Sequence, residues 1–178
     1  MPNTIFISGI HGSGKTTLGT ELSKKLQIPF DSASNIIRRT ANQNWNNEKK
    51  VKNIDQNQNI LKQGVEQLYR HYENIILDGH FTLLNEEGQI KEVGIDTFRS
   101  LGINAIIMCV ANPEGILERL KHRDNRAAFT YEELSMFQKK EEYQAKNIAA
   151  QLNVPIQIYE TDNNNKILDL INFINGGY

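Results

Sequence analysis

Few cysteines, little net charge and no long apolar run mark this 178-residue sequence. Its single cysteine, Cys109, excludes a disulfide framework or a multi-cysteine zinc site within one chain, and its apolar neighbours predict a core position. With a formal net charge of −1, no basic field favours nucleic acid or an anionic membrane as partner. The apolar runs fall far short of the roughly 20 residues that span a membrane, and the first residues lack a signal-peptide pattern. We therefore expect a cytoplasmic protein that binds neither nucleic acid nor membrane.

What the sequence does contain is a regular alternation of two kinds of segment. Short apolar runs rich in β-branched residues predict strands at 4–8, 29–31, 74–78, 104–110 and 155–159. Apolar residues three or four apart predict helices at 15–26, 35–41, 55–72, 130–152 and 166–174, with a further helix that begins at 112. A polar stretch at 85–94 predicts a loop or hairpin. Strands that alternate with helices form a parallel sheet covered on both faces. No linker divides the chain, so we predict one α/β domain over residues 1–178.

The most specific motif lies between the first predicted strand and the first predicted helix. The segment Gly9–Thr16 matches G-x-x-x-x-G-K-[ST] at every fixed position, in the strand–loop–helix context that this motif requires. Backbone N–H groups of such a loop converge on nucleotide phosphates at the N-terminus of the helix. We therefore predict a site for ATP and Mg²⁺, in which Lys15 reaches the β- and γ-phosphates and the Thr16 hydroxyl binds the metal. The predicted donor-binding residues here are Gly9, His11, Gly12, Ser13, Gly14, Lys15, Thr16 and Thr17.

A carboxylate and an imidazole follow the predicted strand at 74–78. Ligands of parallel α/β sheets bind at the carboxyl ends of the strands. Asp78 could therefore hold Mg²⁺, act as a general base toward a hydroxyl acceptor, or make an ordinary turn. No glutamate follows Asp78, which argues against the Asp-Glu pair of ATP-hydrolysing motors. His80 could contact the acceptor or fill the pocket wall, whereas His11 is expected to supply its backbone to the loop.

Basic residues are concentrated between Arg119 and Arg126. Phosphoryl transfer needs positive charge over the phosphate oxygens, and one arginine can bind two of these oxygens at once. We predict catalytic roles for Arg123 and Arg126, although a solvated helix end would also explain the cluster. Arg38 and Arg39 lie where a second phosphate could be anchored, and a solvated helix face explains them almost as well.

Together these motifs resemble the archaeal-type adenylate kinases and their P-loop nucleotide-kinase relatives, over nearly the whole chain. The resemblance rests on the segments 9–17, 52–55, 76–80, 111–120 and 123–126. It implies a three-layer fold around a five-stranded parallel sheet of order 2-3-1-4-5. It also implies an acceptor-binding segment at about 32–72, which includes Arg38 and Arg39, and a short lid at about 119–130.

The resemblance also implies a reaction, ATP + AMP ⇌ 2 ADP with Mg²⁺. In such enzymes lid arginines close over the phosphates, the residue at Arg119 packs against the donor adenine, and the loop that contains Asn163 lies near that base. Two departures concern AMP specificity more than kinase chemistry. The stretch 81–94 is acidic and polar where the family is usually apolar and rich in Pro and Gly, and the lid ends at 127–129 without a further arginine.

The favoured prediction is thus an ATP-dependent nucleoside-monophosphate kinase, with AMP as the first candidate acceptor. The closest alternative is a kinase for a hydroxyl acceptor. A monophosphate is already an ionised nucleophile, whereas a hydroxyl would benefit from Asp78 as a base. A third alternative is a nucleotide-dependent switch or assembly factor that hydrolyses ATP slowly.

Overall fold

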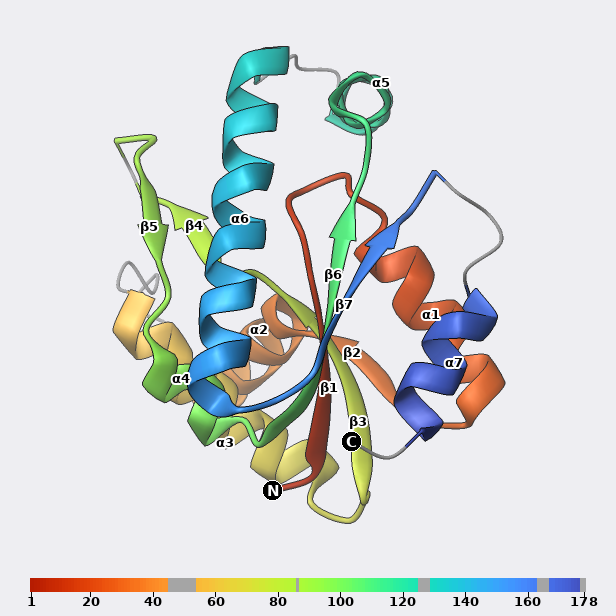
Figure 1. Cartoon of the computed structure of the whole chain (residues 1–178). Helices are drawn as coiled ribbons and strands as arrows, with labels where there is room; N and C mark the ends of the chain where they lie inside the picture. The colour runs from red at the N-terminus through yellow and green to blue at the C-terminus, as the bar shows by residue number, and fades with distance from the viewer. Residues whose placement is uncertain (45–53, 86, 125–128, 163–166, 177–178) are drawn as a thin grey trace.

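Five parallel strands form the sheet at the centre of the protein (Figure 1). They are β1 (Asn3–Ser8), β2 (Phe30–Ser32), β3 (Asn74–Gly79), β6 (Ile103–Val110) and β7 (Ile156–Glu160). The computed structural model describes residues 1–44, 54–85, 87–124, 129–162 and 167–176, and at 42–44, 54–56 and 123–124 it describes the backbone alone.

The strands lie in the order β2-β3-β1-β6-β7. This is the predicted order 2-3-1-4-5 when only the strands of this sheet are counted, because β4 (Thr82–Leu84) and β5 (Ile90–Glu92) form a separate antiparallel hairpin. In the parallel register Ser8 pairs with Gly79, and Ser32 pairs with Asp78. The carboxyl ends of β1, β2 and β3 therefore meet at one edge of the sheet. Several of the predicted site residues follow these strand ends in the sequence.

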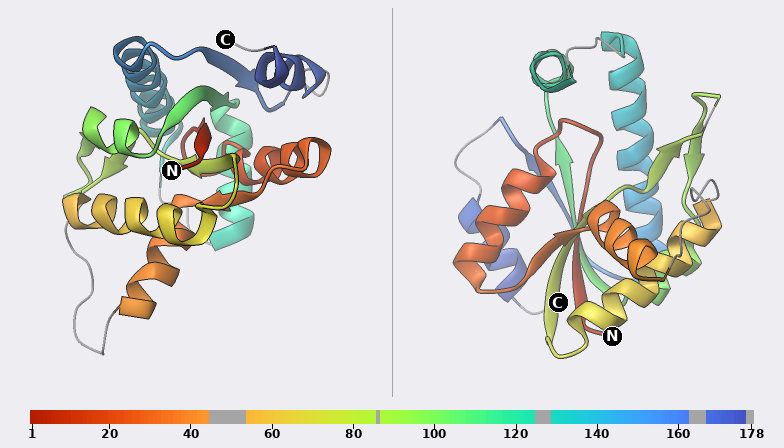
Figure 2. Two further views of the ribbon diagram at one scale, coloured as in Figure 1. Left: turned by 90° about the horizontal axis from the view of Figure 1, so that it is seen from below. Right: turned by 180° about the vertical axis from the view of Figure 1, so that it is seen from behind.

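Helices cover both faces of the sheet, as Figure 2 shows from below and from behind. On one face lie α1 (Lys15–Leu26) and α7 (Ile167–Asn175). The other face is covered by α3 (Ile54–Tyr69), α4 (Ile95–Ser100) and α6 (Tyr131–Leu152). Two further helices complete the domain: α2 (Ala33–Asn44), which packs on α3, and α5 (Pro113–Asp124). This three-layer arrangement confirms the predicted fold class.

Alternating side chains along each strand divide the core between the two faces. In β1, Phe6 packs toward α3 and α6, whereas Ile5 and Ile7 pack toward α1 and α7. Cys109 of β6 is fully buried on the α1 side, as its apolar neighbours predicted, and this burial raises the pKa of its thiol to about 12. Among the helices that the structure describes, none is both long and apolar enough to cross a membrane.

Local signals in the sequence predicted most helix termini correctly. Thr130 and Glu133 form the expected reciprocal capping box at the start of α6. The Asn112 side chain accepts a hydrogen bond from the Glu114 amide, so it caps α5 ahead of the proline at its first position. One element was not predicted: α4 spans only six residues, too few for a periodic pattern, and is held in place by the buried Phe98.

Candidate functional site

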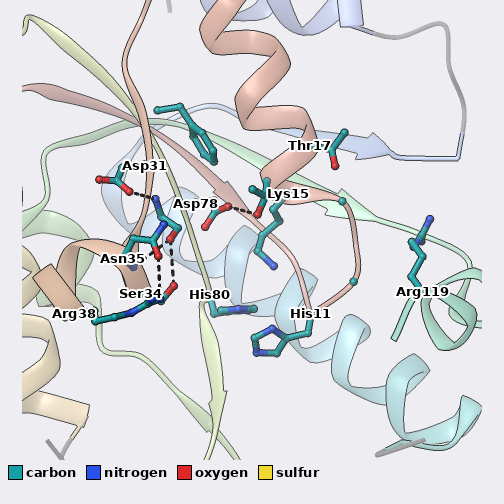
Figure 3. Close-up of a pocket in the computed structure, with 15 residues that line it drawn as sticks. His11, Lys15, Thr17, Asp31, Ser34, Asn35, Arg38, Asp78, His80 and Arg119 are labelled. Atoms are coloured by element: carbon teal, nitrogen blue, oxygen red, sulfur yellow. Dashed lines mark hydrogen bonds between the residues drawn. The ribbon is translucent and has the colours of Figure 1, made fainter. Parts of the chain in front are cut away.

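A cleft of about 670 Å³ opens at the carboxyl edge of β1, β2 and β3 (Figure 3). The phosphate loop and the start of α1 form one side, and the β2–α2 connection forms the other. Most of the predicted site residues line this cleft, namely His11, Gly12, Gly14, Lys15, Thr16, Thr17, Arg38, Asp78, His80 and Arg119. The fold therefore brings together residues more than one hundred positions apart.

The phosphate loop leaves the N-terminus of α1 open toward this cleft. Gly14 precedes the helix in a left-handed conformation, with φ of 94°, and within the described part of the chain no side-chain hydrogen bond caps this helix start. At Gly9 a Cβ atom would lie 2.5 Å from Ser13 Oγ and 2.7 Å from the Cys109 carbonyl oxygen, so only glycine fits. Uncapped N–H groups at a helix N-terminus are the arrangement that binds phosphate.

The Lys15 side chain lies against the phosphate loop, and its ammonium group contacts backbone carbonyl oxygens of that loop. Its Nζ donates to the carbonyl oxygens of Gly9 and Ile10, at 2.7 and 3.0 Å, and its side chain lines the cleft. Figure 3 shows it pointing into the space between the loop and His80. A positive charge held here would face a phosphate bound by the first turn of α1.

Thr16 and Asp78 form a hydrogen-bonded pair of oxygen-bearing side chains that line the cleft. Thr16 Oγ1 donates to Asp78 Oδ2 at 2.9 Å, which joins α1 to the end of β3. Burial raises the pKa of Asp78, while the Thr16 hydrogen bond and the charge of Lys15 act in the opposite direction. Mg²⁺ binds through one or two carboxylate or hydroxyl oxygens together with water and phosphate, so this pair fits that metal.

His80 and His11 lie against each other beside Lys15, with ring centroids 4.6 Å apart. Burial holds the pKa of His80 well below 6.5, with smaller contributions from Lys15 and His11, and a hydrogen bond to the Gly9 backbone opposes this shift. His80 is therefore neutral at neutral pH. Its Nδ1 atom is buried and has no hydrogen-bond partner among the described residues. His80 thus joins the end of β3 to the phosphate loop and lines the cleft as well.

The two arginines predicted for the acceptor phosphate have different surroundings. Arg38 lines the cleft and donates to Asn35 Oδ1 at 3.0 Å. Arg39 instead pairs with the buried carboxylate of Asp31, which also accepts from the Tyr69 hydroxyl at 2.6 Å. The described lining of the cleft does not include Arg39, so its predicted contact with the acceptor phosphate stays a prediction. One helical position separates the two residues by 100°, which turns their side chains in different directions.

Arg119 lies on the far side of the phosphate loop from Arg38 (Figure 3). It pairs with Asp162, whose other oxygen accepts from the Asn112 amide at 2.9 Å, so the start of α5 is tied to the end of β7. These hydrogen bonds lower the pKa of Asp162. Three predicted residues cannot be placed in this way. The side chain of Arg123 and residues Arg126 and Asn163 lie outside the described part of the chain, and so do residues 125–128 of the predicted lid.

A second cavity of about 270 Å³ adjoins the cleft on the side of α3 and α4. It shares four lining residues with the cleft, namely His11, Ser34, Asp78 and His80. Its walls are mainly apolar, with Phe6, Ala33, Ile37, Leu61, Leu83, Phe98 and Leu101. Two amide side chains, Asn57 and Gln58, also face it.

Asn57 and Gln58 lie inside the predicted acceptor-binding segment 32–72 but were not singled out, and Asp31 was not predicted as a site residue. The two amides belong to a polar helix surface in the sequence, where nothing distinguishes them from solvated residues. Asp31 carried a usable signal, because it ends a predicted strand in the same way as Asp78. A consistent use of that rule would have identified it.

The parallel sheet, its strand order and the phosphate loop define a P-loop protein with the kinase fold. The chain belongs to the AAA domain family, which matches residues 8–135. A shikimate kinase of Bacillus cereus (strain G9842) is 28% identical over 140 residues, which make up 77% of this chain and 78% of that relative.

Two solved structures show the same fold. One is a Chloroflexus aurantiacus protein described as a candidate kinase, with a TM-score of 0.57 and 16% identity, covering 99% of this chain and 98% of that one. The other is TT1252 of Thermus thermophilus, with a TM-score of 0.56 and 12% identity, covering 98% and 97%. At these identities the similarity concerns the fold alone.

Proposed function

We propose that the protein is a kinase that transfers the γ-phosphoryl group of ATP to a nucleoside monophosphate, with AMP as the first candidate. The observation that carries this proposal is the junction of two spaces at Asp78 and His80. One is the cleft over the phosphate loop, and the other is the largely apolar cavity beside it. A donor and an acceptor bound in these two spaces would meet where the lining residues are shared.

The donor side supplies the parts that bind ATP. The uncapped first turn of α1 would bind phosphate oxygens through its N–H groups, and Lys15 would contact the β- and γ-phosphates. Mg²⁺ bound with ATP would be held by Thr16 and Asp78, and would neutralise charge on the phosphates. Arg119 would lie beside the donor base, as the resemblance to adenylate kinases implies.

The acceptor side suits a flat base that carries a phosphate. Apolar walls can enclose the base, while Asn57 and Gln58 can hydrogen-bond its polar edge. Arg38 at the cleft could anchor the acceptor phosphate through two N–H groups. In this proposal the segment 32–72 binds the acceptor. A monophosphate oxygen would attack the γ-phosphorus directly, because it is already ionised and needs no base.

The proposal is tested by incubating the protein with MgATP and, in separate reactions, AMP, dAMP, CMP, UMP or GMP, and resolving the nucleotides by chromatography. We expect one monophosphate, AMP first, to yield its diphosphate at a rate well above ADP formation without acceptor. Lys15→Ala serves as the matched inactive control. If no monophosphate yields a diphosphate, the proposed acceptor class is wrong.

A kinase for a hydroxyl acceptor is the second candidate, and two observations favour it. The Bacillus cereus relative is named for a kinase of shikimate, which carries hydroxyl groups. In addition, the described hydrogen bond of Asp78 uses Oδ2, and burial raises the pKa of this carboxyl toward the range in which a general base works well. Shikimate added as a further arm of the same assay tests this candidate. Phosphate transfer to shikimate but to no monophosphate would establish it.

A further inference from the structure

Glu141 is a fully buried carboxylate in the middle of α6, with 0% of its surface exposed. Both of its oxygens accept hydrogen bonds from the chain that follows β3. Oε1 accepts from the Phe81 amide at 2.8 Å, and Oε2 accepts from the Thr82 amide at 2.7 Å and from the Thr82 hydroxyl. The described ion pairs do not include Glu141, so backbone and hydroxyl donors hold its charge.

A carboxylate at this position of α6 carries a desolvation cost that an apolar side chain would not have. Its neighbours on the same face, Phe137, Ala145 and Ile148, all pack into the apolar core. Burial raises the pKa of Glu141, which means that the interior disfavours its charged form, and the three donors and the more weakly acting charge of Lys15 offset that effect only in part. An apolar side chain would avoid the cost but would leave two buried N–H groups without an acceptor.

The segment that Glu141 holds is part of the wall of the acceptor cavity. Gly79, His80 and Leu83 line the cavity, and Phe81 and Thr82 lie between them in the chain. The buried Phe81 ring packs against Phe98, which also lines the cavity, with ring centroids 4.6 Å apart. A carboxylate bound to both central amides therefore sets where this wall lies relative to the phosphate loop.

We infer that Glu141 is a positioning residue for the phosphoryl acceptor, which fixes the cavity wall at residues 79–83 without contacting either substrate. This inference rests on the proposed function to the extent that the acceptor occupies the cavity. The site of ATP binding lies on the other side of His80 and is built by α1 and its loop. A shift of the wall should therefore impair use of the acceptor while leaving ATP affinity unchanged.

The test substitutes Glu141→Gln and compares it with Glu142→Gln. An amide presents one acceptor and one donor, so in either orientation its NH₂ group faces an N–H group and one hydrogen bond is lost. Glu142 is the matched control, because it is a half-exposed neighbour that pairs with Lys146 at 2.6 Å. Thr82→Val is the milder variant, since it removes the hydroxyl donor and retains both backbone bonds.

For Glu141→Gln we expect kcat/KM for the acceptor to fall roughly ten- to a hundredfold, as for a small misplacement at a reacting centre. The Kd for a non-hydrolysable ATP analogue should change by less than about twofold, and Glu142→Gln should match the wild type in both measurements. Thr82→Val should show a smaller fall of the same kind. Equal losses in ATP-analogue and acceptor binding would indicate a general structural role and overturn the inference, as would wild-type acceptor kinetics.

A readout without turnover separates this inference from the proposed function. If the wild type phosphorylates no acceptor, the proposed function fails, and amide hydrogen exchange still tests Glu141. Exchange at Phe81 and Thr82 should be accelerated in Glu141→Gln, and the NMR signals of the His80 ring should move, while the amides of Lys15 and Thr16 stay unchanged. Unaltered exchange at Phe81 and Thr82 would show that Glu141 does not hold this segment.

Discussion

Adjacent residues of one helix can have unrelated roles, and Arg38 and Arg39 of α2 illustrate this. Arg38 lines the cleft, whereas Arg39 forms an ion pair with Asp31 of β2. The Tyr69 hydroxyl of α3 also donates a hydrogen bond to Asp31, and burial raises the pKa of that hydroxyl. Arg39 therefore ties together the two helices that border the largely apolar cavity, whereas Arg38 lines the cleft.

This contrast leads to a prediction with a built-in control. Arg38→Ala should raise KM for the acceptor about tenfold or more, because a charged hydrogen-bond pair to phosphate contributes roughly 1.5–3 kcal/mol. Arg39→Ala should change the acceptor KM little and lower the free energy of unfolding by about 1 kcal/mol or less, since its side chain is 48% exposed. Steady-state kinetics and urea unfolding of both variants check this. Equal kinetic effects would show that the two arginines are not distinguished.

Asp78 gives a pH-dependent prediction. Burial raises its pKa in the folded state above 3.8, so its contribution to stability is largest below about 3.8 and is lost as pH rises through the folded-state pKa. Without nucleotide, Asp78→Asn should therefore gain stability relative to the wild type as pH rises from about 4 to 7. The same variant should lose most of its activity. Urea unfolding across this range measures the difference, with the exposed Asp169→Asn as control; a constant difference would contradict the shifted pKa.

At the scale of single elements, α6 connects the stability of the fold to the site. Its first turn is closed by the capping box of Thr130 and Glu133, and its middle carries Glu141, which holds the segment after β3 beside the largely apolar cavity. The helix also packs on the sheet through Ala145 and Ile148. An element that is anchored at its start and packed along its length can hold a buried carboxylate in a defined position.

The capping box should contribute measurably to stability. Thr130→Ala removes the hydroxyl that accepts from the Glu133 amide, and should lower the free energy of unfolding by about 1 kcal/mol. Thr130→Ser keeps an oxygen at the same place and should stay within a few tenths of a kcal/mol of the wild type. Urea denaturation of the two variants makes the comparison. If both lose the same amount, the loss reflects the methyl group and not the cap.

For the whole molecule, nucleotide binding and stability are linked through the phosphate loop. The loop joins β1 to α1, and Asp78 joins α1 to β3, so a ligand bound here contacts elements from several parts of the sheet. A ligand that binds only the folded state stabilises it by about 2.7 kcal/mol at one hundred times its Kd.

We therefore predict that saturating MgATP raises the Tm of the wild type by roughly 5–10 °C. Lys15→Ala should lose most of this shift and nearly all phosphoryl transfer, because Lys15 is the cation that the loop holds in the cleft. Lys24→Ala, an exposed lysine in the last turn of the same helix, should keep both. Differential scanning fluorimetry with and without MgATP measures the shift. An undiminished shift and rate in Lys15→Ala would refute the assignment of the phosphate loop.

The sequence by itself determined most of the helices and strands and the position of the glycine-rich loop. Strand and helix patterns, the capping box and the glycine-rich loop all depend on residues within a few positions of one another. Their physical causes are local: side-chain periodicity, hydrogen bonds within one turn, and the backbone freedom of glycine. The pairing of Thr16 with Asp78 was also accessible, because strand ends of a parallel sheet meet at one edge.

Only the tertiary structure decided which side chains of α2, α3 and α6 face the cleft or support the cavity beside it. Arg39 forms an ion pair with the Asp31 carboxylate, and Asn57 and Gln58 line a cavity. Glu141 accepts a hydrogen bond from a backbone amide 60 positions away. In the sequence Asn57 and Gln58 have the same appearance as solvated polar residues. Asp31 ends a predicted strand and Glu141 falls on the apolar face of its helix, but neither position reveals the hydrogen-bond partner. Their roles follow from which side chains happen to face one another across packed elements, and a one-dimensional pattern does not specify that.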